Sequence, residues 1–215
     1  MKKPIFNRKK TISKEKKIKK NKKIKILNSK IKKKNKKKKK IKLKKKKMKK
    51  FSKEILKKQL QECMRQTDLG FSVGLIDEND YYKWTVCFTG PEDTIYEGGL
   101  FKAILTFPED FPQNPPEMKF ITEMWHPNIY KDGRVCISIL HPPGIDKFNE
   151  QEKAEERWRP VLGVEQILIS VISMLNEPNC DSPANIDAGV MFRKNRAEYD
   201  KKVKQLVIKS MDEFY

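Results

Sequence analysis

The clearest hydrophobic pattern of the chain lies in its last third. Apolar residues recur there at i, i+3, i+4, i+7, i+8 and i+11, namely Val164, Ile167, Leu168, Val171, Ile172 and Leu175. Because this spacing places them on one face of an α-helix, it predicts a helix over residues 164–175. A stretch rich in Asn and Pro, residues 176–183, ends it. A short helix is predicted from about Ala184, and a final one carries apolar positions from Tyr199 to Phe214.

Alternating apolar and polar residues predict four strands between residues 71 and 120. The apolar member of each alternation is Phe71, Val73 and Leu75, then Tyr82, Trp84, Val86 and Phe88, then Phe101, Ala103, Leu105 and Phe107, and finally Met118 and Phe120. The connections are short and rich in Gly, Pro, Asn and Asp, which favours an antiparallel meander with one packed face. With a helix predicted over about 52–66, the order of elements indicates an α+β fold whose helices cover one face of the sheet.

The first 50 residues depart from this globular pattern. They hold 29 of the 49 Lys and Arg residues and one acid, Glu15, for a net charge of +28, whereas residues 51–215 carry −7. Like charges this dense repel one another and bury little apolar area, so the segment is predicted to be disordered or at most a marginal solvated helix. The chain is therefore divided into a lysine-rich tail, 1–50, and one folded domain, 51–215.

The composition also limits where the protein works. The tail has no apolar core of a secretory signal, and no run approaches a membrane span. Its scarcity of Arg and Ser disfavours an organelle transit segment, which leaves nuclear import, contact with nucleic acid or acidic surfaces, or no role. Four Cys without a CxxC pair and only two His argue against a zinc site. We expect free thiols in a reducing compartment, the cytoplasm or the nucleus.

A polar turn and a thiol form the candidate chemistry. His126-Pro127-Asn128 is followed eight positions after Asn128 by Cys136, and the Lys-Asp-Gly sequence 131–133 between them predicts a tight turn. The turn brings the amide and the thiol back towards each other. A nucleophile beside an amide donor suits acyl transfer. The alternative is that Cys136 is a buried small hydrophobe.

These residues resemble the ubiquitin-conjugating enzyme family. His126-Pro127-Asn128 followed by Cys136 is similar to the family's active-site signature, and the supporting motifs are Tyr96-Glu97-Gly98-Gly99 with Phe101, Phe107-Pro108, Pro115-Pro116, Trp158 with Pro160, Pro178-Asn179 and Pro183-Ala184-Asn185. The resemblance covers residues 51–215. Between Cys136 and Trp158 lie 21 residues, and the segment 141–157 resembles the acidic insertion of the group G members. Those enzymes build ubiquitin chains, typically with ligases of protein quality control.

The resemblance implies an aminoacyltransferase. An activating enzyme, which consumes the ATP, would pass ubiquitin to Cys136 as a thioester, and a lysine amine would then attack it with the help of a ligase. The resemblance implies that the products are polyubiquitin chains that direct proteins to degradation. Asn128 would stabilise the oxyanion or hold the active-site loop. His126 and Pro127 would be structural, and no cofactor or metal is expected. RING-type ligases and the activating enzyme would bind the first helix, Pro112, Gln113 and the stretch around Trp158.

The proton acceptor for the lysine is the open point. Simpler members of the family have an Asp where this chain has Ser182. We therefore expect an acid of the inserted segment, Asp146, to take over, the alternative being a solvated loop whose charges only keep it soluble. A further thiol, Cys180, lies in the loop that carries Ser182, and we interpret it as incidental.

Three rival interpretations remain at this point. A thiol hydrolase would need a His beside Cys136 and a third group to orient it, and only His141, in the inserted segment, is available besides His126. A binding protein without activity would use the basic tail on nucleic acid. A conjugating enzyme for a modifier related to ubiquitin would keep the mechanism, although the acidic insertion favours ubiquitin.

Overall fold

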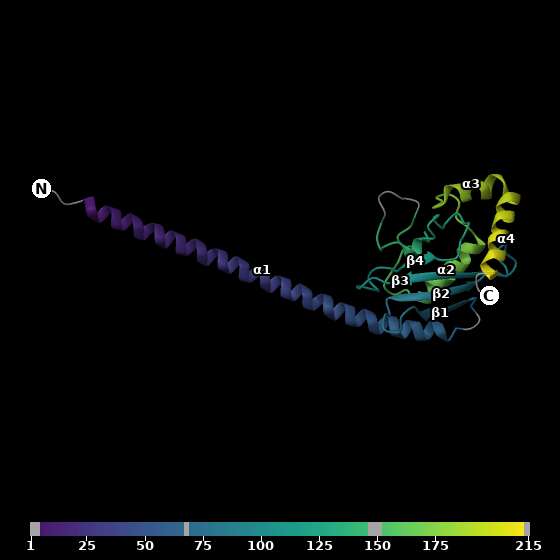
Figure 1. Ribbon diagram of the computed structural model, residues 1–215, viewed down its shortest axis with the longest axis horizontal. Coiled ribbons are helices and arrows are strands. Elements are labelled where there is room, and N and C mark those ends of the chain that lie inside the picture. Colours follow the sequence, from purple (N-terminus) through teal and green to yellow (C-terminus); the bar gives the residue numbers. More distant parts are fainter. Residues whose placement is uncertain (1–4, 67–68, 146–151, 213–215) are drawn as a thin grey trace. The chain divides into compact units, whose positions relative to one another are not determined.

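The computed structural model describes the main chain of residues 5–66, 69–145 and 152–212 (Figure 1), and the side chains of these ranges from residue 30 onwards, except that of residue 31. The chain divides into two compact units, Met1–Lys47 and Met48–Tyr215, close to the predicted domain boundary. The second unit contains the sheet, the C-terminal helices and the candidate chemistry.

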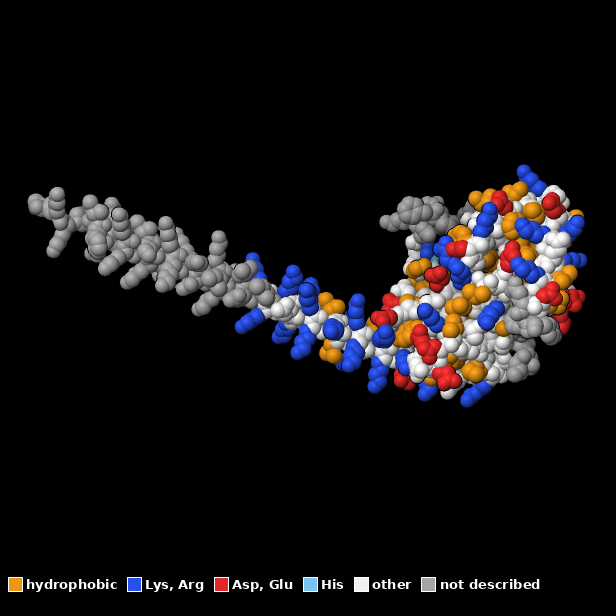
Figure 2. All heavy atoms as spheres, viewed as in Figure 1, with side chains coloured by type: hydrophobic (Ala, Val, Ile, Leu, Met, Phe, Trp, Pro, Cys, Tyr) orange, Lys and Arg blue, Asp and Glu red, His pale blue; other side chains and the backbone are white. Residues whose placement is uncertain are grey.

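Helix α1 spans Ile5–Met64. Its C-terminal part carries the predicted apolar face, because Leu56, Leu60 and Cys63 are buried. The predicted beginning at about residue 52 is wrong, because the helix continues through the lysines, which have high helix propensity and no Gly among them. Lysine side chains project along its described part (Figure 2). The structure contains the solvated-helix alternative for the tail, and disorder in solution stays a prediction that follows from charge repulsion.

The sheet confirms the predicted meander. It consists of β1, Phe71–Leu75, β2, Lys83–Thr89, β3, Leu100–Thr106, and β4, Glu117–Phe120, all antiparallel and in the order β1-β2-β3-β4. The register pairs Val86 with Val73 on one side and with Ala103 on the other. Alternate residues of β2 and β3 are buried, so the sheet has one packed face, as the period of two predicted.

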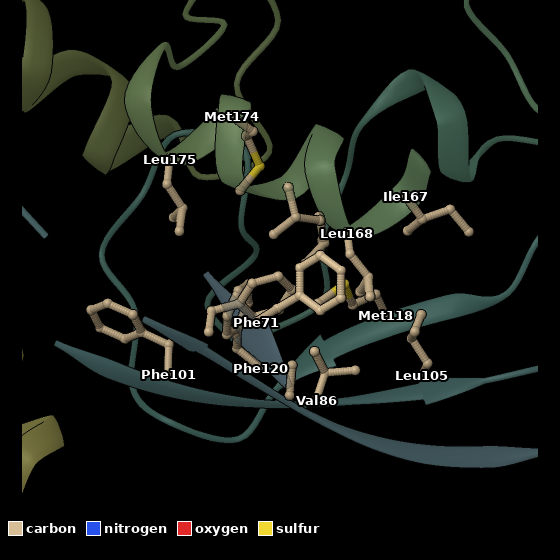
Figure 3. Packing of buried hydrophobic residues seen from close by; sticks show 14 of the residues in the cluster. Phe71, Val86, Phe101, Leu105, Met118, Phe120, Ile167, Leu168, Met174 and Leu175 are labelled. Atoms are coloured by element: carbon tan, nitrogen blue, oxygen red, sulfur yellow. The ribbon is translucent and has the colours of Figure 1, made fainter. Parts of the chain in front are cut away.

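Helix α2, Val164–Asn176, covers the packed face of the sheet (Figure 3). Its buried residues Ile167, Leu168 and Leu175 belong to the same hydrophobic cluster as Leu105 and Phe120 of the strands. Helices α3, Ile186–Lys194, and α4, Arg196–Asp212, follow, and a single turn of 3-10 helix, η1, occupies Ser138–Leu140. The α+β class and the three C-terminal helices are confirmed.

The tight turn after β4 positions the candidate thiol. Gly133 has a positive φ of 90°, and its carbonyl accepts a hydrogen bond from the Phe120 amide at 2.9 Å. A Cβ at this position would lie 2.3 Å from the Phe120 carbonyl oxygen. Both the backbone conformation and the close approach to β4 therefore require glycine.

We expect Gly133→Ala to lower the free energy of unfolding by roughly 2–3 kcal/mol, because it combines an unfavourable φ with a clash against main chain. Gly98→Ala is the matched control, since Gly98 has a φ of 78° but no atom within 4 Å of an added Cβ. The control is expected to cost only about 1 kcal/mol of conformational strain. Urea unfolding at pH 7 measures both, and equal costs would contradict the role of the close approach.

Candidate active site

The turn 126–136 brings the amide and the thiol together as predicted. Ile129 and Val135 face each other in an antiparallel bridge. The main-chain amide of Cys136 donates to the Asn128 carbonyl at 2.9 Å, which places the two residues side by side at the open end of the turn. The position of Cys136 is therefore fixed by main-chain hydrogen bonds on a short, paired segment.

His126 is the buried anchor of this turn. Its side chain is 0% exposed, its Nδ1 accepts from the Asn128 amide at 2.9 Å, and its Nε2 lies 3.0 Å from the Met174 carbonyl, so that Nε2 carries the hydrogen. Burial lowers the pKa of His126 to about 4. A neutral ring with both nitrogens bonded to main chain cannot serve as a base towards a substrate, which agrees with its predicted structural role.

Asn128 joins the turn to the loop before α3. Its Nδ2 donates to the Asn179 carbonyl at 2.7 Å, and its Oδ1 accepts from the Asn179 amide at 2.8 Å. The neighbouring Pro127 carbonyl accepts from the amide of Asn185, the residue that caps α3. Of the two roles expected for Asn128, this geometry favours holding the loop, while the second hydrogen on Nδ2 has no partner among the described residues.

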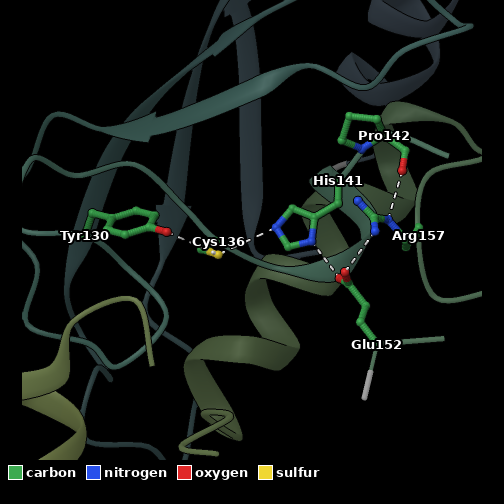
Figure 4. Close-up of polar contacts among 6 residues, drawn as sticks. All are labelled: Tyr130, Cys136, His141, Pro142, Glu152 and Arg157. Carbon is green, nitrogen blue, oxygen red and sulfur yellow. Dashed lines mark hydrogen bonds and ion pairs between the residues drawn. The ribbon is translucent and has the colours of Figure 1, made fainter. Parts of the chain in front are cut away.

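Cys136 is half-buried and lies between two polar side chains (Figure 4). Its Sγ lies 3.6 Å from His141 Nε2, and the Tyr130 hydroxyl donates to it at 3.8 Å. The hydrogen bond from His141 is the main cause that lowers the pKa of Cys136, Tyr130 lowers it further, and partial burial opposes both. A lowered pKa increases the thiolate fraction, and the thiolate is the nucleophilic form.

An ion pair from the inserted segment supports His141. The Nδ1 of His141 lies 2.6 Å from Glu152 Oε1, and Glu152 Oε2 lies 3.5 Å from Arg157 Nη1. The Glu152 side chain is only 5% exposed and that of Arg157 9%. The hydrogen bond with Cys136 first, and Glu152 second, raise the pKa of His141 against the effect of burial. The four side chains form one connected row (Figure 4).

A hollow of about 290 Å³ opens beside this row. Its lining includes Cys136, His141 and Glu152, and Ser182 and Glu177 come to it from the loop after α2. Ser182 and the thiol thus line the same hollow, and the role of Ser182 at a gate position stays a prediction. Asp146, the predicted proton acceptor, lies outside the described residues.

The predicted partner-binding residues need a correction. Pro112 and Trp158 are buried, and the Trp158 indole N–H donates to the Pro112 carbonyl at 2.7 Å. A buried indole needs an acceptor for its N–H, and the Pro112 loop supplies it. These two residues therefore support the surface from below, whereas Gln113 and Val161 are exposed on it.

His141 and Glu152 were not predicted as partners of Cys136. The available signal was the spacing, because His141 follows Cys136 by five residues at the end of η1, and the acids of the inserted segment were already candidates. Within the described ranges, no group of three or more His, Cys, Asp or Glu side chains is arranged to hold a metal. None of the helices in those ranges has both the length and the apolar character needed to cross a bilayer.

Comparison with known proteins agrees with this geometry. A family model described as ubiquitin-conjugating enzyme matches residues 55–207. The "Probable ubiquitin-conjugating enzyme E2 7" of Caenorhabditis elegans is 61% identical over 162 residues, which cover 75% of this chain and 98% of the relative. Ubiquitin-conjugating enzyme E2 15 of Schizosaccharomyces pombe is 56% identical over 161 residues, 75% of this chain and 96% of the relative.

A solved structure extends the comparison to three dimensions. The structure of human ubiquitin-conjugating enzyme E2 G1 is 58% identical in sequence and superposes with a TM-score of 0.51. The superposition covers 57% of this chain and 93% of the human chain. The lysine-rich residues 1–50 lie outside the range that the family model matches.

We expect acid to destabilise the fold through His126. The pKa of about 4 in the folded protein lies below the ordinary histidine value of 6.5. The unfolded chain therefore binds more protons between these values, and stability falls as the pH drops through that window. The loss is roughly 3 kcal/mol below pH 4. Urea unfolding from pH 7 to pH 4 measures it.

The matched variant is His126→Asn, whose Oδ1 can accept from the Asn128 amide in place of Nδ1. The difference in unfolding free energy between wild type and variant should shrink as the pH falls below 6.5, because only the wild type carries this titrating group. A difference that stays constant across the window would contradict the assignment.

Proposed function

Because the chain belongs to the ubiquitin-conjugating enzymes, which are transferases, and resembles their group G members, we propose that Cys136 accepts ubiquitin as a thioester and passes it to lysine amines. The observation that carries this proposal is the lowered pKa of Cys136 on a turn that fixes its position beside Asn128. A thiolate attacks an acyl group readily and leaves it readily, as a carrier must.

The first role of Asn128 in this reaction is to hold the neighbouring loop in place. Its two hydrogen bonds to Asn179 fix the loop whose residues Asn179 and Ser182 line the hollow. The remaining Nδ2 hydrogen is the group that an oxyanion would use when a lysine attacks, and removing one such donor typically costs roughly 3 kcal/mol of transition-state stabilisation. Both roles need the same side-chain orientation, so they are compatible.

We propose that the products are polyubiquitin chains that mark proteins for degradation. This finer assignment is supported by the similarity to E2 G1 and by the inserted segment. The carboxylates of Glu152 and Glu177 line the hollow beside Cys136 and favour a positively charged acceptor such as a ubiquitin lysine.

The upstream partner is the ubiquitin-activating enzyme, which consumes the ATP, so this chain needs no cofactor of its own. The downstream partners are ubiquitin ligases, for which we propose the RING type. Gln113 and Val161 are among the exposed residues of the loops that Pro112 and Trp158 support, and Val161 is 83% exposed. A large exposed apolar side chain of this kind is a suitable anchor for a partner.

A charging assay tests the reaction and the nucleophile together. Ubiquitin, activating enzyme and ATP should convert wild type to a heavier species that a thiol reductant reverses, whereas Cys136→Ser should give an oxyester that resists the reductant. Cys180→Ser is the matched control, because Cys180 lies in the neighbouring loop and its pKa is raised by burial, and it should charge like wild type. The absence of any adduct with ubiquitin would overturn the proposal.

The tail adds a second contact in the cytoplasm or nucleus. We propose that residues 1–50, with a net charge of +28, bind nucleic acid or another acidic surface through charge alone. With a 30-base-pair DNA duplex as probe, the full chain should bind with an affinity that falls steeply between 50 and 200 mM salt, and residues 48–215 should not bind. Equal binding by both would contradict this role, and neither result affects the charging assay.

A further inference from the structure

The inserted segment contributes a base to the active site. We infer that the imidazole of His141 accepts the proton of the attacking lysine, oriented by Glu152, which Arg157 in turn holds in place. This inference deepens the proposed function and rests on it. It assigns the proton acceptor, for which the sequence favoured Asp146 among the acids of the inserted segment.

His141 is held rigidly enough for this task. It is the residue that ends η1, where its main-chain amide donates to the Ser138 carbonyl at 2.9 Å. Its carbonyl accepts from the amide of the buried Trp158 at 3.1 Å. The main-chain amide and carbonyl of His141 are thus both fixed by hydrogen bonds. The orientation of the imidazole ring is set by its side-chain contacts. A base positioned in this way loses little entropy when the substrate arrives.

The contacts of the ring select the useful tautomer. Glu152 Oε1 lies 2.6 Å from Nδ1 and accepts its hydrogen, so in the neutral ring the lone pair is on Nε2, which faces Cys136 Sγ at 3.6 Å. A carboxylate whose side chain is 5% exposed needs compensation, and Arg157 provides it at 3.5 Å. The Nε of Arg157 donates to the Pro142 carbonyl at 2.9 Å, which ties the guanidinium to the beginning of the inserted segment. Glu152 and Arg157 are positioning residues.

The charge on the Cys136 sulfur influences whether His141 is protonated. Whenever Cys136 is a thiolate, its negative charge stabilises a protonated His141, and the contact with Cys136 raises the pKa of His141. Acylation converts the sulfur to a neutral thioester, so this stabilisation is lost and the imidazole releases its proton to solvent. Forming the thioester therefore leaves a neutral base next to the carbonyl that will be attacked.

In the transfer step, the lysine nitrogen loses two protons, one to solvent and one to His141. The ammonium of the lysine first loses one proton to solvent, and its neutral nitrogen attacks the thioester carbonyl carbon. The C–N bond forms, the C–S bond breaks with its electron pair on Cys136, and the second proton passes from the nitrogen to His141 Nε2. The products are an isopeptide bond, a thiolate and an imidazolium, so the resting pair is restored for the next charging step.

The charged groups around the ring suit this cycle. Besides Cys136 and Glu152, the hollow is lined by the carboxylate of Glu177, and Tyr130 donates to the sulfur from the side opposite His141 (Figure 4). The carboxylates of Glu152 and Glu177 attract a lysine, and together with the released thiolate they favour the protonated imidazole after transfer. Ser182 also lines the hollow but cannot ionise, so it offers no competing carboxylate at the gate position.

The test is single-turnover discharge of the ubiquitin-charged full chain to free lysine between pH 6 and pH 9, with the rate divided by the fraction of neutral amine. For the wild type, the plot of this corrected rate against pH should show an inflection at the pH where His141 loses its proton. His141→Gln should remove the inflection and lower the rate at pH 8 about 100-fold or more. Glu152→Gln should keep an inflection but move it to lower pH, because the charge that raises the pKa of His141 is gone.

Glu156→Gln is the matched control, since Glu156 is an exposed acid of the same segment and should behave like wild type. Alkylation of Cys136 by iodoacetamide as a function of pH gives a readout that needs no ubiquitin, and His141→Gln should shift its midpoint upwards. The inference would be overturned if His141→Gln discharged ubiquitin at the wild-type rate with an unchanged pH profile. It would also be overturned if Asp146→Asn lost the inflection while His141→Gln kept it. If the wild type failed to accept ubiquitin at all, the proposed function itself would be contradicted. The alkylation profile would still test the interaction between Cys136 and His141.

Discussion

The exchange of two hydrogen bonds between the Asn128 side chain and the main chain of Asn179 holds the active site together. The amide is almost completely buried, and an unsatisfied buried polar group costs about 1–3 kcal/mol, so the two segments cannot separate cheaply. The same turn carries His126, which is bonded to α2, and the Asn128 carbonyl that receives the Cys136 amide. Strand β4, α2 and the loop before α3 are thus all bonded to the turn 126–136, and the thiol takes its position from that turn.

The connected row of Cys136, His141 and Glu152 is also what a thiol hydrolase would need. On the sequence alone, that rival lacked a His placed beside the thiol and a third group to orient it, and the structure supplies both. The row by itself therefore does not separate hydrolysis from conjugation. Family membership does, together with a fold that matches a ubiquitin-conjugating enzyme over 93% of that enzyme's chain. The difference between the two reactions then lies in the acceptor, an amine rather than water.

The parts of the fold that follow from local periodicity were predictable. The six apolar positions from Val164 to Leu175 and the alternation in the strands depend only on which face is buried, and both were confirmed. The burial of Trp158 under the Pro112 loop was not predictable, because it depends on contacts between residues 46 positions apart. The row of Cys136, His141 and Glu152 was not predicted for the same reason. Glu152 contacts His141 across 11 positions of the sequence, and neither charge nor spacing along the chain predicts that contact.

The pairing of Cys136 with His141 also makes the enzyme sensitive to oxidants. Cys63, Cys87 and Cys180 have raised pKa values because burial disfavours their thiolates, whereas the pKa of Cys136 is lowered. Peroxide attacks thiolates, so sulfenic acid should form first at Cys136, the cysteine that we propose carries ubiquitin. In the proposed reaction, oxidation of Cys136 would therefore stop ubiquitin transfer until a reductant restored the thiol.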